Sequence, residues 1–142
     1  MEIKDDKFKS IKQEAEKIYK NIDEVLCPYF GSNIVFNAKG LEHIKFKSKR
    51  KARSREDQYM RLKLIPLASR ILEKSHTLQG ISEKRSLEYE KINSRWEYVM
   101  KNSTYYEFVA VVKRVRVKVI IKQVENGPKY FLEYNSFLEA KK

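Results

Sequence analysis

Most of the residues that we expect to bind a charged ligand or take part in catalysis lie in two clusters of lysine and arginine that contain no acidic residue. The first runs from Lys45 to Arg55, KFKSKRKARSR, where seven of eleven residues are basic. The second, KRVRVKVIIK from Lys113 to Lys122, carries five more. Outside these windows basic and acidic residues are equal in number, so the net charge of +12 comes from the two clusters. Such a localised field is typical of proteins that bind a polyanion, whether RNA, DNA or an acidic protein.

The second cluster alternates like a β-strand with two different faces. One face is apolar and consists of Val115, Val117, Val119 and Ile121. The other is mainly cationic and consists of Arg114, Arg116, Lys118, Ile120 and Lys122. If Asn126-Gly127 forms a two-residue turn, Ile120 lies opposite Glu133 and Lys118 opposite Asn135. This register places the Glu133 carboxylate among the cations, and a similar register for the preceding hairpin brings Glu107 to the same face.

This face can be an ordinary solvated surface, because antiparallel sheets commonly expose one side. The functional alternative is cleavage of RNA through its 2′-hydroxyl. That reaction needs a base for the hydroxyl proton, cations for the charge on the phosphorane and an acid for the leaving oxygen. Arg and Lys suit the second role. Glu107 suits the acid or base role, and so does His43, which precedes the first cluster, although an isolated histidine is more often a surface or packing residue.

Other chemistries fit the composition poorly. The four glycines are too dispersed for a phosphate-binding glycine loop. One cysteine, two distant histidines and four aspartates make a metal site hard to assemble, so we expect no metal and no cofactor. The single Cys27 excludes an intramolecular disulfide, and the first residues, MEIKDDKFKS, lack the apolar core of a signal peptide. We therefore expect a cytoplasmic protein with no membrane partner.

The elements that position these residues divide into helices first and strands last. Apolar spacing predicts a long helix from about Asp6 to Leu26, a short one in residues 37–46, and one from Arg55 to Lys74 that Pro66 breaks. NIVF (33–36) is β-prone, residues 75–86 are loop-like, and residues 86–102 are ambiguous. Three β-rich runs follow from Tyr105. We therefore predict one α+β domain, residues 1–142, with helices to about residue 75. They pack on one face of an antiparallel meander of three to four strands at about residues 95–138.

Several stretches together resemble a known group of enzymes. IVFNAKGLEHI, the basic segment after it, and YYEFVAVVKRVRVKVIIKQVENGPKYF are similar to the superfamily of barnase, EndoU, colicin and RelE type ribonucleases, with the phage and mobile-element branches closest. The resemblance covers residues 33–137, and its motifs are moderately specific. It implies metal-independent RNA cleavage, often by a toxin that an acidic antitoxin neutralises.

The resemblance also assigns roles to individual residues. His43 matches a helix-borne histidine, Arg116 and Lys118 match phosphate-facing strand positions, and Tyr106 matches an aromatic position near the site. The chain departs from some branches, because FLEYNSF lacks an aromatic-Ser pair and no second histidine lies on the meander. A mechanism with two histidines therefore fits poorly, whereas a RelE-like site of Lys, Arg and Tyr stays open.

The leading hypothesis is a small endoribonuclease toxin. Its expected catalytic residues are His43, Glu107, Arg116, Lys118 and Tyr106. The residues expected to hold the nucleic acid are Lys45, Lys47, Lys49, Arg50, Lys51, Arg53, Arg55, Arg61, Arg114 and Lys122. Expected partners are RNA, either mRNA, tRNA or ribosome-associated, and an acidic antitoxin.

The alternatives are a non-catalytic nucleic-acid-binding accessory protein of a phage or mobile element, and a scaffold that docks on an acidic protein. Most aromatic residues among the cations are expected in the core, but an exposed one could stack on a base.

Overall fold

The computed structural model describes residues 5–48, 51–52, 54–63, 65–112 and 114–138, and gives only the backbone for His43 and several others in these ranges. The described part forms four helices and eight strands, which confirms the α+β class. The helices are α1 (Asp5–Ile22), α2 (Ala38–Lys45), α3 (Arg55–Lys63) and α4 (Ile65–Glu73). The strands are β1 (Glu24–Cys27), β2 (Ser32–Val35), β3 (Phe46–Ser48), β4 (Lys51–Ala52), β5 (Gly80–Ile92), β6 (Arg95–Val112), β7 (Val115–Val124) and β8 (Lys129–Leu138).

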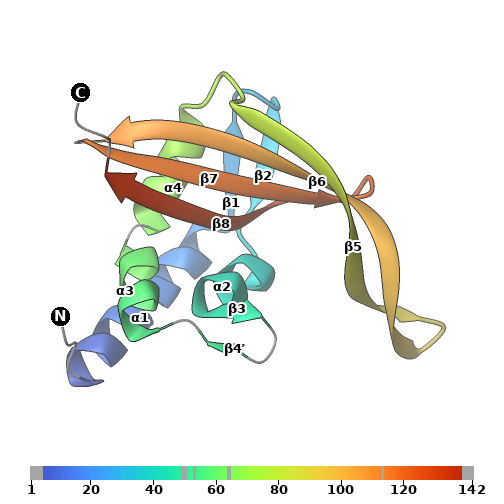
Figure 1. Ribbon diagram of the computed structural model, residues 1–142, viewed down its shortest axis with the longest axis horizontal. Coiled ribbons are helices and arrows are strands. Elements are labelled where there is room, and N and C mark those ends of the chain that lie inside the picture. Colours follow the sequence, from blue (N-terminus) through green and yellow to red (C-terminus); the bar gives the residue numbers. More distant parts are fainter. Residues whose placement is uncertain (1–4, 49–50, 53, 64, 113, 139–142) are drawn as a thin grey trace.

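The main sheet has six strands in the order β1-β2-β8-β7-β6-β5 (Figure 1). β2 and β8 pair in parallel, and all the other neighbours are antiparallel, so the sheet is mixed. The prediction of three to four strands was therefore wrong. The β1-β2 hairpin of the N-terminal half adds two strands beside β8. The meander also begins at Gly80 rather than near residue 95.

The first helix is shorter than its apolar spacing predicts. Phe8, Ala15 and Tyr19 are buried on one side of α1, and acidic residues in its first turn favour its start. The chain leaves the helix at Asp23, which has a φ of 55°. Beyond it, Val25 and Cys27 are buried in alternation with exposed neighbours. This period of two forms strand β1, where the sequence had predicted the end of the helix.

The break that Pro66 predicts is confirmed. α3 ends at Lys63 and α4 begins at Ile65, so Pro66 lies in the first turn of α4. A proline is tolerated there, because the first turn of a helix does not use its backbone N–H groups for helical hydrogen bonds. The break turns the chain so that Leu62 of α3 and Leu72 of α4 both reach the core.

The core lies between one face of the sheet and the helices. Phe108, Val117, Val119, Ile121 and Phe131 of the sheet are essentially inaccessible to solvent. They join one buried cluster with side chains from three helices and the first two strands: Ala15, Tyr19, Val25, Cys27, Ile34, Leu62, Ile65, Ala68, Ile71 and Leu72. The opposite face of β6 and β7 carries the predicted cations and is called the outer face below.

Strands β5 and β6 continue beyond the sheet as a two-stranded arm. β6 pairs with β7 only from Ser103 onward, whereas its pairing with β5 extends to the turn. Residues 85–102 therefore form a ribbon that projects away from the helices (Figure 1). Asn93 and Ser94 at its tip both have positive φ values, 50° and 67°, as a type I′ turn requires. The sequence left this region ambiguous, because its alternating apolar residues are separated by Glu and Lys, which are also common in helices.

The first basic cluster also has regular structure. It forms the end of α2, the small antiparallel pair β3-β4 and the start of α3. No pattern in the sequence indicates the short pairing of Phe46 with Ala52, because the residues between them are mostly charged. The cluster thus lies between two helices of the helical part.

Candidate functional site

The two faces of β7 differ as predicted. Val117, Val119 and Ile121 are fully buried, whereas Arg116 is exposed and Lys118 is partly exposed on the outer face. Glu107 of β6 pairs with Ile120, which brings its carboxylate to the same outer face. The predicted partners of β7 on β8 are confirmed as well, because Ile120 pairs with Glu133 and Lys118 with Asn135.

The turn that leads into β8 differs from the prediction. Gln123 pairs with Lys129, so the loop is not a two-residue Asn-Gly turn, and Glu125 lies in it with a φ of 50°. The register then shifts between Ile120 and Ile121. This bulge adds one residue on β8 and restores the predicted pairing further along. Sequence alone does not reveal two irregularities that cancel each other.

Glu107 and Lys118 form the centre of the outer face. Their carboxylate oxygen and ammonium nitrogen lie 3.6 Å apart, and about a third of each side chain is exposed. They are diagonal neighbours on adjacent strands, because Lys118 pairs with Val109. Arg116 follows on the same face opposite Val111, which is 51% exposed. A carboxylate, two cations and an apolar surface thus lie side by side and open to solvent.

Gln79, just before β5, and Gly80, its first residue, hold Glu107 in place. The backbone N–H of Gln79 donates to the carbonyl of Glu107 at 3.0 Å, and the N–H of Val109 donates to the side-chain oxygen of Gln79 at 2.8 Å. Gly80 pairs directly with Glu107, and a Cβ on Gly80 would lie 2.5 Å from a carboxylate oxygen of Glu107. The missing side chain of Gly80 therefore leaves the space that this carboxylate occupies.

Tyr106 does not join this group. Its side chain lies on the helix-covered face, where its ring packs edge-on against Phe30 at 4.8 Å and its hydroxyl donates to Gln123 at 3.1 Å. Burial raises the pKa of Tyr106, and the nearby Tyr29 and Glu83 add to that increase. Because neighbouring residues of a strand point to opposite faces, Tyr106 and Glu107 cannot share the outer face. The prediction that they act together was wrong, and Tyr105 is the tyrosine on that face.

Lys122 is engaged in a structural network instead of being open to a phosphate. Its side chain is 11% exposed, and its ammonium donates to Glu88 of the arm at 3.1 Å. Burial alone would lower the pKa of Lys122. Tyr130, the hydrogen bond and charge of Glu88, and Tyr105 outweigh that effect, so the pKa is raised and the ammonium stays charged. Lys122 thus joins the arm to the sheet.

Lysine ammonium groups and tyrosine rings alternate in a row around Lys122. The sequence did not predict this row. Lys84 and Lys122 lie 5.5 and 5.6 Å from the centre of the Tyr105 ring, and Lys39 of α2 lies 5.4 Å from that of Tyr130. Tyr105 and Tyr130 are the partners of Lys122 on its two neighbouring strands. The signal was present in the sequence as tyrosines at the positions opposite this lysine. The correct register near the loop was needed to find it.

Besides Lys122, three described residues of the set expected to hold the nucleic acid are paired with carboxylates. Lys45 pairs with Glu16, Arg55 with Asp5, and Arg61 with Asp57. These ion pairs lie within the helical part and neutralise part of the positive charge. Arg114 is exposed in the β6-β7 turn, next to the outer face. The predictions for Lys49, Arg50 and Arg53 fall outside the described residues, as do those for the side chains of His43, Lys47 and Lys51.

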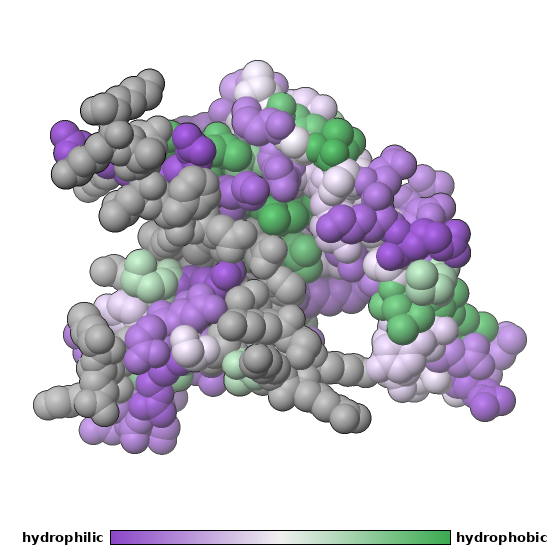
Figure 2. All heavy atoms as spheres, viewed as in Figure 1, coloured by the Kyte–Doolittle hydropathy of each residue, from purple (hydrophilic) through white to green (hydrophobic). Residues whose placement is uncertain are grey.

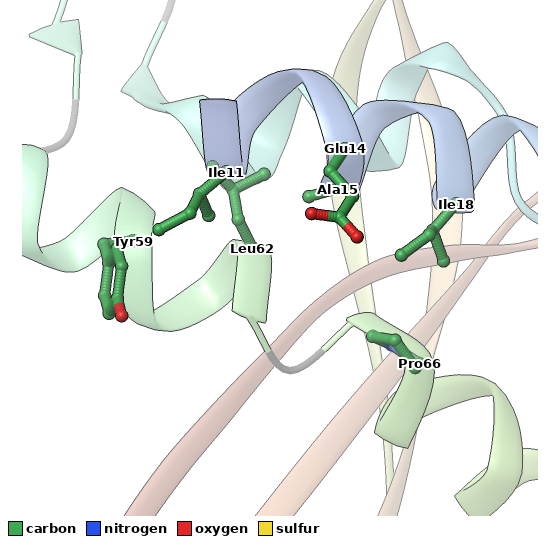
Figure 3. A pocket seen from close by; sticks show the side chains of 7 residues that line it. All are labelled: Ile11, Glu14, Ala15, Ile18, Tyr59, Leu62 and Pro66. Atoms are coloured by element: carbon green, nitrogen blue, oxygen red, sulfur yellow. The ribbon is translucent and has the colours of Figure 1, made fainter. Parts of the chain in front are cut away.

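The helical part contains a separate apolar pocket of about 270 Å³ between α1, α3 and α4 (Figure 3). Its lining includes Ile11, Ile18, Leu62 and Pro66, with Glu14 as its one acidic group. It is formed by helices alone and does not contain the predicted catalytic residues. Within the described ranges, no group of three His, Cys, Asp or Glu is placed to hold a metal ion. In the same part of the chain no helix is long and apolar enough to cross a membrane.

Comparisons with known proteins return no relative. No protein-family model matches the chain, and neither a curated protein nor a solved structure matches it. The resemblance to ribonucleases therefore stays a prediction, and the arrangement of side chains on the outer face is what supports a function.

Proposed function

We propose that the chain is a small metal-independent endoribonuclease that cleaves RNA on the outer face of its sheet. The observation that carries this proposal is the placement of the Glu107 carboxylate 3.6 Å from Lys118, with Arg116 on the same exposed face. In this mechanism Glu107 accepts the proton of a 2′-hydroxyl, and the 2′-oxygen attacks the adjacent phosphorus. Lys118 and Arg116 stabilise the negative charge of the phosphorane.

The leaving 5′-oxygen needs a proton donor, and His43 is the residue proposed for it. This assignment comes from its sequence position before the basic cluster. We further propose that the protein is the toxin of a toxin-antitoxin pair in the cytoplasm. Its net charge of +12 supports binding of RNA and of an acidic antitoxin.

The test is digestion of RNA by the purified protein in the presence of EDTA. The wild type should cleave RNA but leave intact an oligonucleotide that lacks the 2′-hydroxyl at every position. Glu107→Gln keeps the shape of the side chain but removes the base, so cleavage should fall at least about a hundredfold while RNA binding persists. Intact RNA after incubation with the wild type would refute the enzyme proposal.

A second function, RNA binding without cleavage, is favoured by one observation. Tyr106 faces the core and Lys122 is bonded to Glu88, so only part of the predicted catalytic set shares the outer face. Under this alternative the protein binds RNA with an affinity that falls steeply as salt increases, and no product forms. The same digestion, combined with a binding titration at two salt concentrations, separates the two functions.

A further inference from the structure

The arm formed by residues 85–102 has two chemically different faces. Leu87 pairs with Met100, Tyr89 with Tyr98, and Lys91 with Trp96, so the five large apolar and aromatic side chains share one face. Each of them is about half exposed, between 48% for Met100 and 59% for Trp96. The Tyr89 ring stacks on Trp96 at 5.2 Å and lies 4.7 Å from Tyr98. We call this surface the aromatic face of the arm.

The charges of the arm are divided between its faces. Residues 85–102 are all described, and their three carboxylates, Glu88, Glu90 and Glu97, lie on the face opposite the aromatic one. Two of them pair with lysines, since Lys122 binds Glu88 and Lys101 lies 2.7 Å from Glu90. The aromatic face carries Arg85 and Lys91, both exposed. At the foot of the arm, Glu83 and Glu125 line the same pocket as Arg85, whereas Lys91 lies further out near the tip.

The size of the aromatic face favours a nucleic acid over a protein as its occupant. The exposed halves of its three aromatic side chains amount to roughly 200–400 Å², and those of Leu87 and Met100 add a smaller area. Each partner in a stable protein complex buries ~800 Å². A ribbon two strands wide that stands clear of the helices (Figure 2) offers little neighbouring surface to extend the contact. A base, in contrast, needs only the face of one ring to stack upon, and a nearby cation for its phosphate.

We propose that the aromatic face of the arm binds unpaired nucleotides of an RNA by stacking bases on Trp96 and Tyr98, with Arg85 and Lys91 contacting the phosphates. This inference rests on the proposed function in taking RNA as the ligand. It adds a binding surface outside the cleavage site and makes the protein selective for single strands, because the bases of a duplex do not expose their faces. The arm would hold one part of an RNA while the outer face of the sheet acts on another.

The chain contains its own probe for this contact, because Trp96 is its only tryptophan. The experiment uses the full chain and an unstructured twelve-nucleotide RNA with 2′-O-methyl sugars, which block cleavage. Anisotropy of a dye on the RNA reports binding anywhere on the protein. Tryptophan emission, measured with the same RNA lacking the dye, reports stacking on the arm. Both signals should change over the same range of concentration, and a duplex of equal length should not quench Trp96.

Variants provide a second measurement. Replacing both Trp96 and Tyr98 with Ala should weaken single-strand binding by at least roughly 5- to 150-fold, the range that loss of even one stacked base gives. Replacing both with Phe retains the rings and should leave binding nearly unchanged, which separates stacking from a folding defect of the arm. Leu26→Ala is the matched control, because Leu26 is as exposed as Trp96 but lies on β1.

The outcomes distinguish this inference from the proposed function. If anisotropy rises while tryptophan emission stays constant, RNA binds elsewhere and the arm proposal is overturned. If anisotropy does not rise, RNA is not the ligand, and the proposed function fails together with the arm. If emission shifts with protein concentration in the absence of RNA, the aromatic face pairs with a second copy of the chain, which also overturns the proposal.

Discussion

At the scale of single residues, the chemistry proposed for the outer face depends on the position of one carboxylate. Glu107 is fixed through its backbone by Gln79, and its side chain occupies the space left by Gly80. Neither residue contacts a substrate in the proposed mechanism. Both are positioning residues, since they determine where the carboxylate lies relative to Lys118.

Gly80→Ala should therefore reduce cleavage without unfolding the protein. The added Cβ displaces only the flexible end of Glu107, so stability should change by less than about 1 kcal/mol, whereas the displaced base should lower kcat about tenfold or more. Single-turnover cleavage and urea unfolding measure the two effects. Ser82→Ala, two residues along the same strand and face, is the control and should leave both unchanged. Full activity of Gly80→Ala would show that the position of Glu107 is not critical.

How well the sequence predicts side-chain positions depends on how local the determining interaction is. Alternation along β7 is local, so its two faces were predicted correctly. The same rule applied to β6 places Tyr106 and Glu107 on opposite faces. The conflict was overlooked, because Tyr106 came from the family resemblance and Glu107 from the strand register, and the two were then combined in one site. The partners of Lys122 depend on a loop and a bulge in β8, which no local pattern in the sequence shows.

At the scale of elements, the arm depends on a buried ion pair at its base. Glu88 and Lys122 are 14% and 11% exposed, and they connect the arm to the middle of the sheet. Two-stranded ribbons are marginally stable by themselves, so a contact between the ribbon and the sheet contributes to holding it in place.

Breaking this pair from one side should be costly. Glu88→Gln leaves the Lys122 ammonium poorly compensated, and Lys122→Met does the same to the carboxylate, so each should destabilise the protein by about 3 kcal/mol. The double variant should cost clearly less than the sum of the two, because it leaves no unpaired charge. Urea unfolding of all four proteins completes the cycle. Additive losses would mean that the two side chains do not interact.

The turn at the tip of the arm can be made more stable by a single substitution. Ser94 holds a φ of 67°, which costs a residue with a Cβ roughly 1 kcal/mol and glycine almost nothing. Ser94→Gly should therefore slow hydrogen exchange of the amides in the arm about fivefold. Ser94→Ala retains the Cβ and should give no such protection. Equal exchange in all three proteins would show that the turn does not limit opening of the arm.

At the scale of the whole molecule, several titrating groups each make the folded protein less stable as the pH becomes alkaline. Burial raises the pKa of Tyr19 strongly, even though a hydrogen bond from the backbone of Leu41 opposes it. Burial also raises the pKa of Tyr130, and the pKa of Lys122 is raised by its partners. A raised pKa in the folded state means that the folded protein holds these protons to higher pH than the unfolded chain does.

The free energy of unfolding should therefore be steady below the ordinary tyrosine pKa of 10.0 and fall as the pH rises beyond it. Tyr19→Phe removes the largest of these contributions and should flatten the fall. It also loses the hydrogen bond from the Tyr19 hydroxyl to the carbonyl of Asn37, 2.6 Å long, at a cost of about 1 kcal/mol near neutral pH. Urea unfolding at pH 8, 10 and 11 measures both effects. Stability that rises with pH would contradict this assignment.

The overall class of the fold was predictable, but the composition of its sheet was not. Helical spacing, the break at Pro66 and the β-rich end of the chain are local signals, and they gave an α+β layout correctly. The joining of β2 to β8 depends on a contact between segments separated by most of the chain. No periodicity in either segment indicates that partner. The length of β5 was missed for another reason, since the Glu and Lys residues that separate its apolar positions are also common in helices.

The place of β8 in the sheet determines when the sheet can fold during synthesis of the protein. β8 is the last of the six strands to leave the ribosome, yet it lies between β2 and β7. Until it emerges, the N-terminal hairpin and the β5-β7 meander have no strand to join them, and Phe131 is missing from the core. Folding of the complete sheet therefore waits until translation has passed Leu138. The sheet that carries Glu107, Lys118 and Arg116 is therefore complete only after almost all of the described residues have been synthesised.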